Sequence, residues 1–196
     1  MTSLRHNSES IGSAAPSDVD AYLDAARACI LDVGWRRTTL TEVARRSGVS
    51  RMTIYRRWSD MPTLLADLMT REWGGVAATH QAEEDLVEAM VATVQTLRDN
   101  ELFVRIVELD PELLLPYVLN RRGRSQQAIL DILEVRITSA QQAGTVRPGS
   151  AAAIARALLL ACHGFVLSAH TMVDDAVDEA ALDDELRRLL AGVLAP

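Results

Sequence analysis

Apolar residues recur along most of the chain at spacings of three and four, which is the period of an amphipathic α-helix. The first such stretch begins at Ser17, which can form a capping box with Asp20, and ends at Gly34. One apolar face of this helix carries Val19, Tyr22, Leu23, Ala26, Ile30 and Val33. No alternating run of Val, Ile and Thr predicts a strand. The pattern therefore indicates an all-α protein.

Two short helices follow the first one. Thr39 and Glu42 form a second capping-box signal, and the helix that they begin ends at Gly48. Ser50 is the next cap and predicts a helix over about 51–57. The N-terminal part of the chain thus reads as short helix, glycine-containing turn, short helix, which is the outline of a helix-turn-helix.

A fourth helix begins at Ser59–Asp60, with Pro62 in its first turn. Gly74 and Gly75 weaken its end and mark a domain boundary. The remaining helices are expected at about 83–99, 101–109, 111–120, 122–143, 150–172 and 178–194. The predicted organisation is a mobile tail (1–16), a helix-turn-helix domain of three to four helices with a core of its own (17–59), a connecting helix (60–75) and a C-terminal helical bundle (76–196).

Charge is distributed unevenly along the chain. The formal net charge is −7, and all 20 basic residues are arginine. Residues 34–58 hold seven arginines and one acid, a local balance of +6, whereas residues 76–196 hold ten arginines and eighteen acids. The overall charge argues against nucleic acid as a partner, but the basic segment argues for it.

Composition favours a cytoplasmic protein without a membrane partner. The longest purely apolar run, Ala157–Cys162, has six residues, whereas a membrane span needs about 20. Arg5 precedes no apolar stretch that would make a signal peptide. Cys29 and Cys162 are too few for a disulfide framework.

The turn between the two short helices has the residues that its geometry requires. Gly48 can take a positive φ without strain, and Val49 can fill the corner. In the helix that follows, Ile54 and Trp58 are spaced i, i+4 and are expected to face the core. Arg51, Met52, Thr53, Tyr55 and Arg56 are left facing outward. This outward surface combines positive charge with hydrogen-bond donors.

The segment from Thr38 to Trp58, with Gly34-Trp35 before it and Leu64-Leu65 after it, resembles the TetR (tetracycline-repressor-like) family. The resemblance covers about residues 18–66 and implies a homodimeric repressor of a pseudo-palindromic operator, released by a small molecule. It also implies DNA-binding roles for Thr39, Thr41, Ser50, Arg51, Met52, Thr53, Tyr55, Arg56 and Arg57. Two positions depart from the family, which often has a glycine in place of Met52 and a phosphate-binding lysine in place of Met61.

Two further readings remain open, a DNA-binding regulator without a ligand and a small helical enzyme with an incidental basic patch. Cys162 and His163 are adjacent on a helix and point about 100° apart, so they do not form a nucleophile–base pair. His163, His170 and Asp174 would share a face if their helix continued that far, but no second cluster supports a metal site. We predict no catalytic residues, no metal and no cofactor.

A stripe of small residues predicts a subunit contact. Ala157, Ala161, Gly164 and Ser168 recur at spacings of 4, 3 and 4, which lets another helix approach closely. The last helix offers Leu182, Leu186, Leu189, Leu190 and Val193 as a partner face. The family resemblance implies that these two helices form a four-helix dimer bundle. The alternative for the stripe is a helix crossing within one subunit.

Apolar residues of the C-terminal half also predict the wall of an effector pocket, although each of these residues is more often ordinary core than a ligand contact. They are Met90, Val94, Leu97, Phe103, Val107, Leu114, Tyr117, Leu133 and Phe165. Arg105, Arg136 or His163 can anchor a polar group of the ligand. The mostly apolar set favours a small hydrophobic effector.

Overall fold

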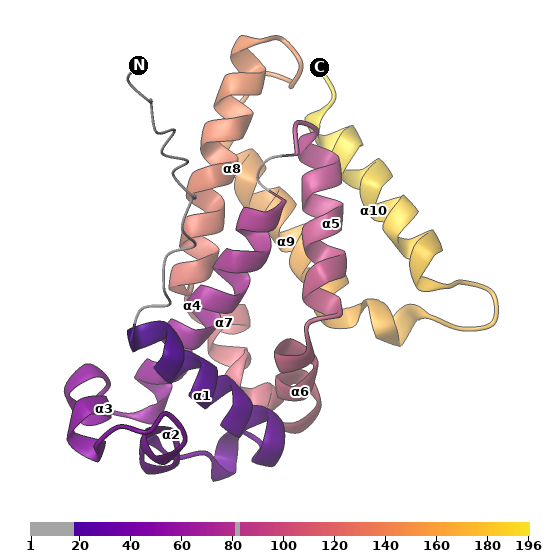
Figure 1. Cartoon of the computed structure of the whole chain (residues 1–196). Helices are drawn as coiled ribbons and strands as arrows, with labels where there is room; N and C mark the ends of the chain where they lie inside the picture. Colours follow the sequence, from indigo (N-terminus) through magenta and orange to yellow (C-terminus); the bar gives the residue numbers. More distant parts are fainter. Residues whose placement is uncertain (1–17, 81–82) are drawn as a thin grey trace, which may run out of the picture.

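The structure is a computed structural model that describes residues 18–80 and 83–196, and within these residues it contains helices but no strand (Figure 1). The α-helices are α1 (Asp18–Val33), α2 (Leu40–Arg46), α3 (Arg51–Arg57), α4 (Met61–Thr79), α5 (Leu86–Arg98), α6 (Glu101–Leu109), α7 (Leu115–Leu119), α8 (Arg124–Gln142), α9 (Ala151–Ser168) and α10 (Glu179–Leu194). Three short 3-10 helices are η1 (Trp35–Arg37), η2 (Pro111–Leu113) and η3 (Ala169–Met172). The predicted tail, 1–16, and the predicted cap at Ser17 lie outside the described residues.

The caps predicted for the short helices are present. The side chains of Thr39, Ser50 and Asp60 accept hydrogen bonds from backbone N–H groups in the first turns of α2, α3 and α4. Gly48 has a φ of +72°, as its place in the turn between α2 and α3 requires. Only the Thr39 half of the capping box at α2 is formed, because the Glu42 carboxylate pairs with Arg45 instead.

Three boundaries differ from the sequence-based expectation. Helix α4 continues through Gly74 and Gly75 to Thr79, because a glycine costs only about 1 kcal/mol in a helix and α4 packs against α5 and α8. The helix expected at 111–120 is divided into η2 and α7, each with a proline in its first turn. The helix expected at 150–172 ends at Ser168 and continues as η3.

The molecule has two hydrophobic cores. The first lies in a head formed by α1, α2, α3 and the first half of α4, at the lower left of Figure 1. The second lies in a body formed by α5, α8, α9 and α10. The head was expected to have a separate core, but Leu102 and Ile106 of α6 complete it. The backbone N–H of Trp35 also donates to the buried carboxylate of Asp110, so head and body share packing and hydrogen bonds.

By length and composition, one helical stretch of the described chain, Ala151–Met172, is apolar enough to cross a membrane. The sequence-based expectation of no such stretch was wrong, because it counted uninterrupted apolar runs and so missed a segment with few charges. Ile154, Leu158 and Cys162 of this stretch are buried in the second core, where α9 packs against α5, α8 and α10. One side of α9 therefore lies in the core of the body, whereas Ala157, Leu160 and Gly164 on the rest of its surface are exposed.

Candidate nucleic-acid interface and effector cavity

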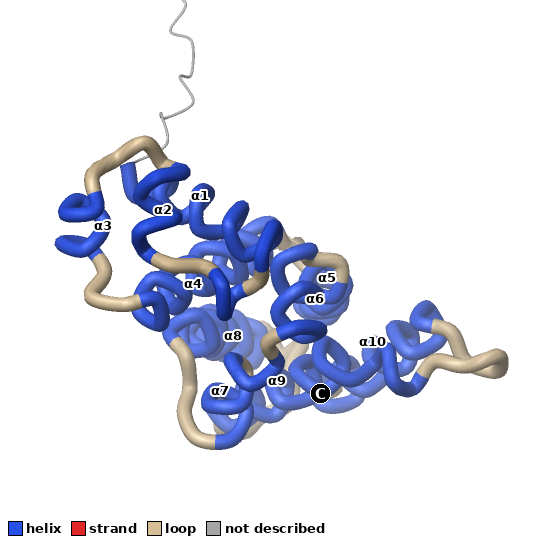
Figure 2. The backbone as a smooth tube through the Cα atoms, turned by 90° about the horizontal axis from the view of Figure 1, so that it is seen from below, coloured by secondary structure: helices blue, strands red, loops and turns tan. Residues whose placement is uncertain are grey.

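Helix α3 lies at the outer edge of the head and presents one face to solvent (Figure 2). Ile54 and Trp58 are completely buried, as their spacing predicts, and fix the helix to the core. Arg51, Tyr55 and Arg56 are exposed, and the side chain of Met52 at the tip is 68% exposed. The outward and inward faces of α3 are therefore divided as the sequence analysis expected.

The first turn of α3 is held by its own hydroxyl groups. Ser50 Oγ accepts from the Thr53 backbone N–H at 3.2 Å and lies 2.9 Å from Thr53 Oγ1. Thr39 has the corresponding position before α2, and Thr41 is half-buried beside it. Polar groups at the first turns of two short helices thus frame the exposed face.

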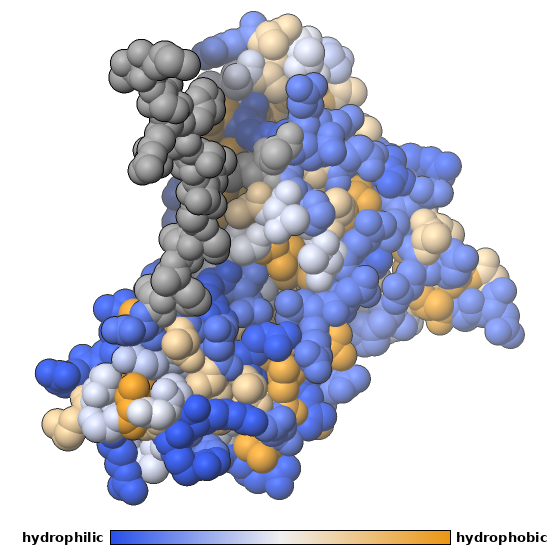
Figure 3. Space-filling model, in the orientation of Figure 1, coloured by the Kyte–Doolittle hydropathy of each residue, from blue (hydrophilic) through white to orange (hydrophobic). Residues whose placement is uncertain are grey.

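Five of the seven arginines of residues 34–58 fall into two groups in the structure. Arg36, Arg45 and Arg46 form ion pairs with acidic residues, which are Asp110 and Glu112, Glu42, and Asp32 respectively. Arg51 and Arg56 have no hydrogen-bond or ion-pair partner within residues 18–80 and 83–196. The sequence predicted a balance of +6 for this segment, and the fold reduces the charge that is free to meet a partner. Hydrophilic residues dominate the lower edge of the head in Figure 3.

The C-terminal end of α3 is braced by α4 and α8. Trp58 Nε1 donates to Asp67 Oδ2 at 2.7 Å, and Arg124 forms an ion pair with the same carboxylate. Burial raises the pKa of Asp67, but the bonds from Trp58 and Arg124 outweigh it and hold this pKa below its ordinary value. The Arg57 guanidinium lies 6.0 Å from the centre of the Trp58 ring. This brace links α8 of the body to α3 of the head, and the sequence contained no local signal for it.

A cavity of about 140 Å³ lies in the body between α4, α5, α7, α8 and α9. Seven of the nine predicted wall residues line it, namely Met90, Val94, Leu97, Phe103, Leu114, Tyr117 and Leu133, and so do two of the three predicted anchors, Arg136 and His163. Phe165 does not, because it packs against the second core, and Val107 is half-buried away from it on α6. Three residues in or directly after α4 were missed: Trp73, because the predicted helix at 60–75 was assigned only to connecting the domains, and Ala77 and His80, because that helix was expected to end at its glycines.

The cavity is apolar except for a few side chains. Gln126 Nε2 lies 3.4 Å from His163 Nε2, and burial lowers the pKa of His163, which keeps the imidazole neutral at neutral pH. Arg136 lies at the other end of the part of α8 that lines the cavity. Its guanidinium donates hydrogen bonds to the backbone carbonyls of Glu83 and Glu84. Arg105, considered as an anchor, does not line the cavity. A neutral polar group at one end and a cation at the other thus interrupt the apolar wall.

The residues considered for chemistry at α9 do not form a site. Burial raises the pKa of the Cys162 thiol to about 12, so it is not a thiolate at neutral pH. His163, His170 and Asp174 do not share a helical face, because α9 ends at Ser168. Within residues 18–80 and 83–196, no group of three His, Cys, Asp or Glu side chains is placed to hold a metal ion.

Helix α9 exposes much of its small-residue stripe. Ala157, Gly164 and Ser168 are exposed, and Ala161 is half-buried. On α10, Leu189 is 55% exposed, whereas Leu182 and Val193 are half-buried. Leu186 and Leu190 were expected on the partner face, but they are 0% and 1% exposed because they pack into the subunit's own second core. The exposed face of α10 is therefore narrower than expected.

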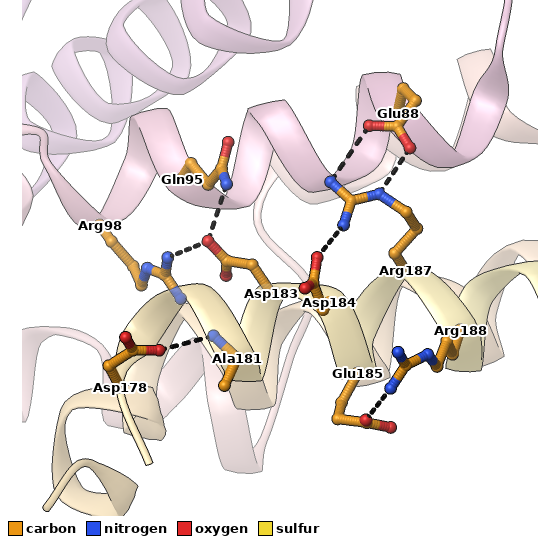
Figure 4. A network of polar contacts seen from close by, with 10 residues as sticks. All are labelled: Glu88, Gln95, Arg98, Asp178, Ala181, Asp183, Asp184, Glu185, Arg187 and Arg188. Carbon is orange, nitrogen blue, oxygen red and sulfur yellow. Dashed lines mark hydrogen bonds and ion pairs between the residues drawn. The ribbon is translucent and has the colours of Figure 1, made fainter. Parts of the chain in front are cut away.

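Charged side chains attach α10 to α5, as Figure 4 shows. Asp183 accepts from Gln95 at 2.7 Å and from Arg98 at 2.8 Å. One turn further along α10, Arg187 pairs with Glu88. These contacts fix the orientation of α10 and thus determine which of its residues face outward.

Comparisons with known proteins agree with this geometry. Residues 23–68 match the family model described as bacterial regulatory proteins, tetR family. An HTH-type transcriptional regulator of Mycobacterium bovis is 39% identical over 176 residues, which are 88% of this chain and 92% of the relative. The chain belongs to the TetR family. It is therefore a DNA-binding transcriptional regulator.

Two solved structures have the same fold as this chain. The Rhodococcus erythropolis repressor QsdR has a TM-score of 0.66 at 16% identity, over 91% of this chain and 96% of that chain. The complex of SmeT with triclosan has a TM-score of 0.58 at 21% identity, over 91% and 95% of the two chains. The TetR family thus accounts for both the N-terminal helix-turn-helix and the C-terminal helical body.

Proposed function

We propose that this TetR family regulator is a homodimeric repressor of a pseudo-palindromic operator and that a small hydrophobic molecule releases it. The observation that carries the proposal is the outward face of α3. Arg51 and Arg56 lie there without partners in the described chain, while Ile54 and Trp58 anchor the helix from below. Charged groups left unpaired on a rigid helix are suited to the major groove of DNA.

Each residue of the interface has a proposed role. Ser50, Arg51 and Thr53 approach bases or phosphates in the groove, and Met52 lies against a thymine methyl group. Thr39 and Thr41 approach phosphate at the start of α2. The remaining residues, Tyr55, Arg56 and Arg57, contact the DNA backbone. Phosphate contacts orient the head, and base contacts select the sequence.

The proposed dimer uses the exposed side of α9 and α10. Ala157, Gly164 and Ser168 permit close approach, and Leu160 is 70% exposed beside them. Leu189 of α10 adds apolar surface. A two-fold dimer places two copies of α3 at one fixed separation, so it fits only a half-site spacing that matches. The proposed division of labour is DNA binding by 17–59, connection by the helix predicted at 60–75, and effector binding and dimerisation by 76–196.

The proposed effector is an apolar molecule with a neutral polar group, which meets either Arg136 or the pair Gln126 and His163. The apolar wall of the cavity supports this choice, and a neutral His163 favours a hydroxyl or carbonyl over a carboxylate at that end. The structure of SmeT with triclosan supports a small-molecule site in a protein of this fold. The alternative, a regulator without a ligand, has no explanation for the cavity.

No enzymatic role is proposed, because the Cys162 thiol beside His163 has a pKa near 12. A transcriptional regulator acts on chromosomal DNA, so the proposed place of action is the cytoplasm. The function is tested by selecting bound fragments from genomic DNA and footprinting them. We expect a protected site with two-fold symmetry and lower reporter expression when the protein is present. Protection without symmetry would contradict the dimer, and higher expression would contradict repression.

A further inference from the structure

A second and smaller cavity lies between the main cavity and the head. Its volume is about 50 Å³. Leu65 and Met69 of α4, Ile106 of α6 and Arg124 of α8 line this small chamber but not the main cavity. The small chamber therefore reaches from the body to the core of the head, to which Leu65, Met69 and Ile106 also belong.

A thin partition separates the two spaces. Both are lined by Trp73, Leu114, Tyr117, Ser125 and Gln126. Trp73 packs edge-on against Phe103, and its indole Nε1 is buried without a hydrogen-bond partner in the described chain. Tyr117 belongs to α7, which has only five residues. Because no hydrogen bond holds the indole of Trp73, a rotation of this side chain breaks no hydrogen bond.

The far wall of the small chamber touches the brace of α3. Arg124 lines the chamber and pairs with Asp67, and Asp67 accepts the hydrogen bond from Trp58 at the end of α3. A group that enters the chamber meets Arg124 directly. It therefore acts on the contact that links α8 to α3.

We propose that the small chamber is a second ligand subsite, which takes the apolar end of an elongated ligand whose polar end lies near Arg136, at the far end of the main cavity. Its occupation separates Arg124 from Asp67 and so removes the link between α8 and the end of α3. The proposal rests on the proposed function of the main cavity. The subsite predicts that binding and release depend differently on ligand length. Short ligands bind in the main cavity without releasing DNA, and only ligands long enough to pass Trp73 and Tyr117 release it.

The length of the main cavity supports an elongated ligand. Gln126 and Arg136 both line it and are ten residues apart on α8, which corresponds to about 15 Å along the helix. Gln126 also lines the small chamber. A linear molecule lying along α8 therefore has space for an arm at the end nearest the head.

Straight-chain primary alcohols from hexanol to dodecanol are the probes. Their dissociation constants are measured by calorimetry, and release of a fluorescent operator fragment is measured by anisotropy. For the wild-type protein we expect about fourfold tighter binding for each buried methylene. Release should begin only above a threshold chain length. Equal release by every alcohol that binds would overturn the subsite.

Two alanines of α4 provide matched variants. Ala66 lines only the small chamber and Ala77 only the main cavity. In Ala66→Leu, short alcohols should bind within twofold of wild type, whereas long alcohols should bind at least tenfold more weakly and no longer release the operator. Ala77→Leu should weaken every alcohol. Ala66→Val is the milder variant if Ala66→Leu does not fold.

The outcomes separate the subsite from the function on which it rests. Binding of alcohols with an unchanged release threshold in Ala66→Leu and Ala66→Val would overturn the subsite and leave the main cavity as the effector site. Failure of every alcohol to bind the wild-type protein would contradict the effector cavity itself, and the subsite with it.

Discussion

The head and the body of this regulator handle polar and apolar groups in opposite ways. The head packs apolar side chains tightly around Trp58 and presents Arg51, Tyr55 and Arg56 to solvent. The body leaves an apolar space inside its bundle and closes it with helices from four parts of the chain. A rigid outer face suits recognition of one DNA shape, whereas an internal space suits a molecule that changes the packing.

The largest expected effect is a difference in the free energy of unfolding between a substitution in the head and one in the body. Leu68 is completely buried in the head core, and Leu97 is a half-buried wall residue of the cavity. Leu68→Ala should lower the free energy of unfolding by about 2–5 kcal/mol. Leu97→Ala borders existing space and should lower it by about 1–2 kcal/mol. Denaturant titration of both variants measures the difference, and equal losses would mean that the cavity wall is packed as tightly as the head.

Overpacking the proposed dimer surface comes next. Gly164 is exposed, and a Cβ built there meets no described atom within 4 Å, so Gly164→Leu should not disturb the subunit itself. In a two-fold contact the added side chain intrudes twice, at about 1–3 kcal/mol each. Light scattering should therefore detect monomer or a much weaker dimer, and operator binding should fall with it. A dimer of unchanged dissociation constant would place the contact elsewhere.

The division of the arginines predicts unequal effects on DNA binding. Arg51→Ala removes an unpaired side chain from the outward face of α3 and should weaken specific binding at least tenfold, since a base contact contributes about 1–3 kcal/mol. Arg45→Ala also removes one positive charge, but the Arg45 side chain already forms an ion pair with Glu42. This substitution should therefore weaken DNA binding less than threefold. Anisotropy at fixed salt compares them. Equal losses would show that pairing within the fold does not matter.

The sequence was sufficient for most of the head because its signals are local. A cap, a turn glycine and an i, i+4 pair determine α2, the turn and α3 within about twenty residues. The paired state of Arg36 was not predictable, because its partners Asp110 and Glu112 lie more than seventy residues away.

The body was less predictable because its features depend on tertiary packing. Leu186 and Leu190 share a face with Leu182 and Leu189 in the sequence pattern, and only the packing of α10 on α5 and α9 decides which of them are buried. The cavity shows the same dependence. Seven of the nine predicted wall residues line it, but Ala77 and His80 required α4 to continue beyond its glycines.

A charge added at the start of α4 should change the salt dependence of DNA binding. Met61 is half-buried at the first residue of α4, where the family often has a lysine that binds phosphate. Met61→Lys should tighten binding and steepen the log–log salt slope by about 0.9 for each new phosphate contact, or about 1.8 per dimer. Titration at several salt concentrations gives the slope. An unchanged slope would mean that Met61 does not face phosphate.

The smallest expected effect is the pH dependence at the cavity. Burial lowers the pKa of His163 in the folded protein below the ordinary value of about 6.5. As the pH falls through 6.5, the unfolded chain binds a proton that the folded chain does not, so His163 lowers stability. The stability of wild type relative to His163→Gln should therefore fall between pH 7.5 and pH 5.5, as measured by denaturant titration. A constant difference would contradict a neutral, buried His163.

The most direct test of the outward face of α3 uses a single thiol at its tip. Cys29 and Cys162 are only 1% and 8% exposed, so Met52→Cys places a uniquely accessible thiol among the described cysteines. Maleimide labelling is followed with no DNA, with a genomic fragment recovered by the selection, and with a scrambled fragment. The account predicts rapid labelling that the selected fragment blocks and the scrambled fragment does not. Equal labelling in all three samples would contradict the assignment of α3 to the operator.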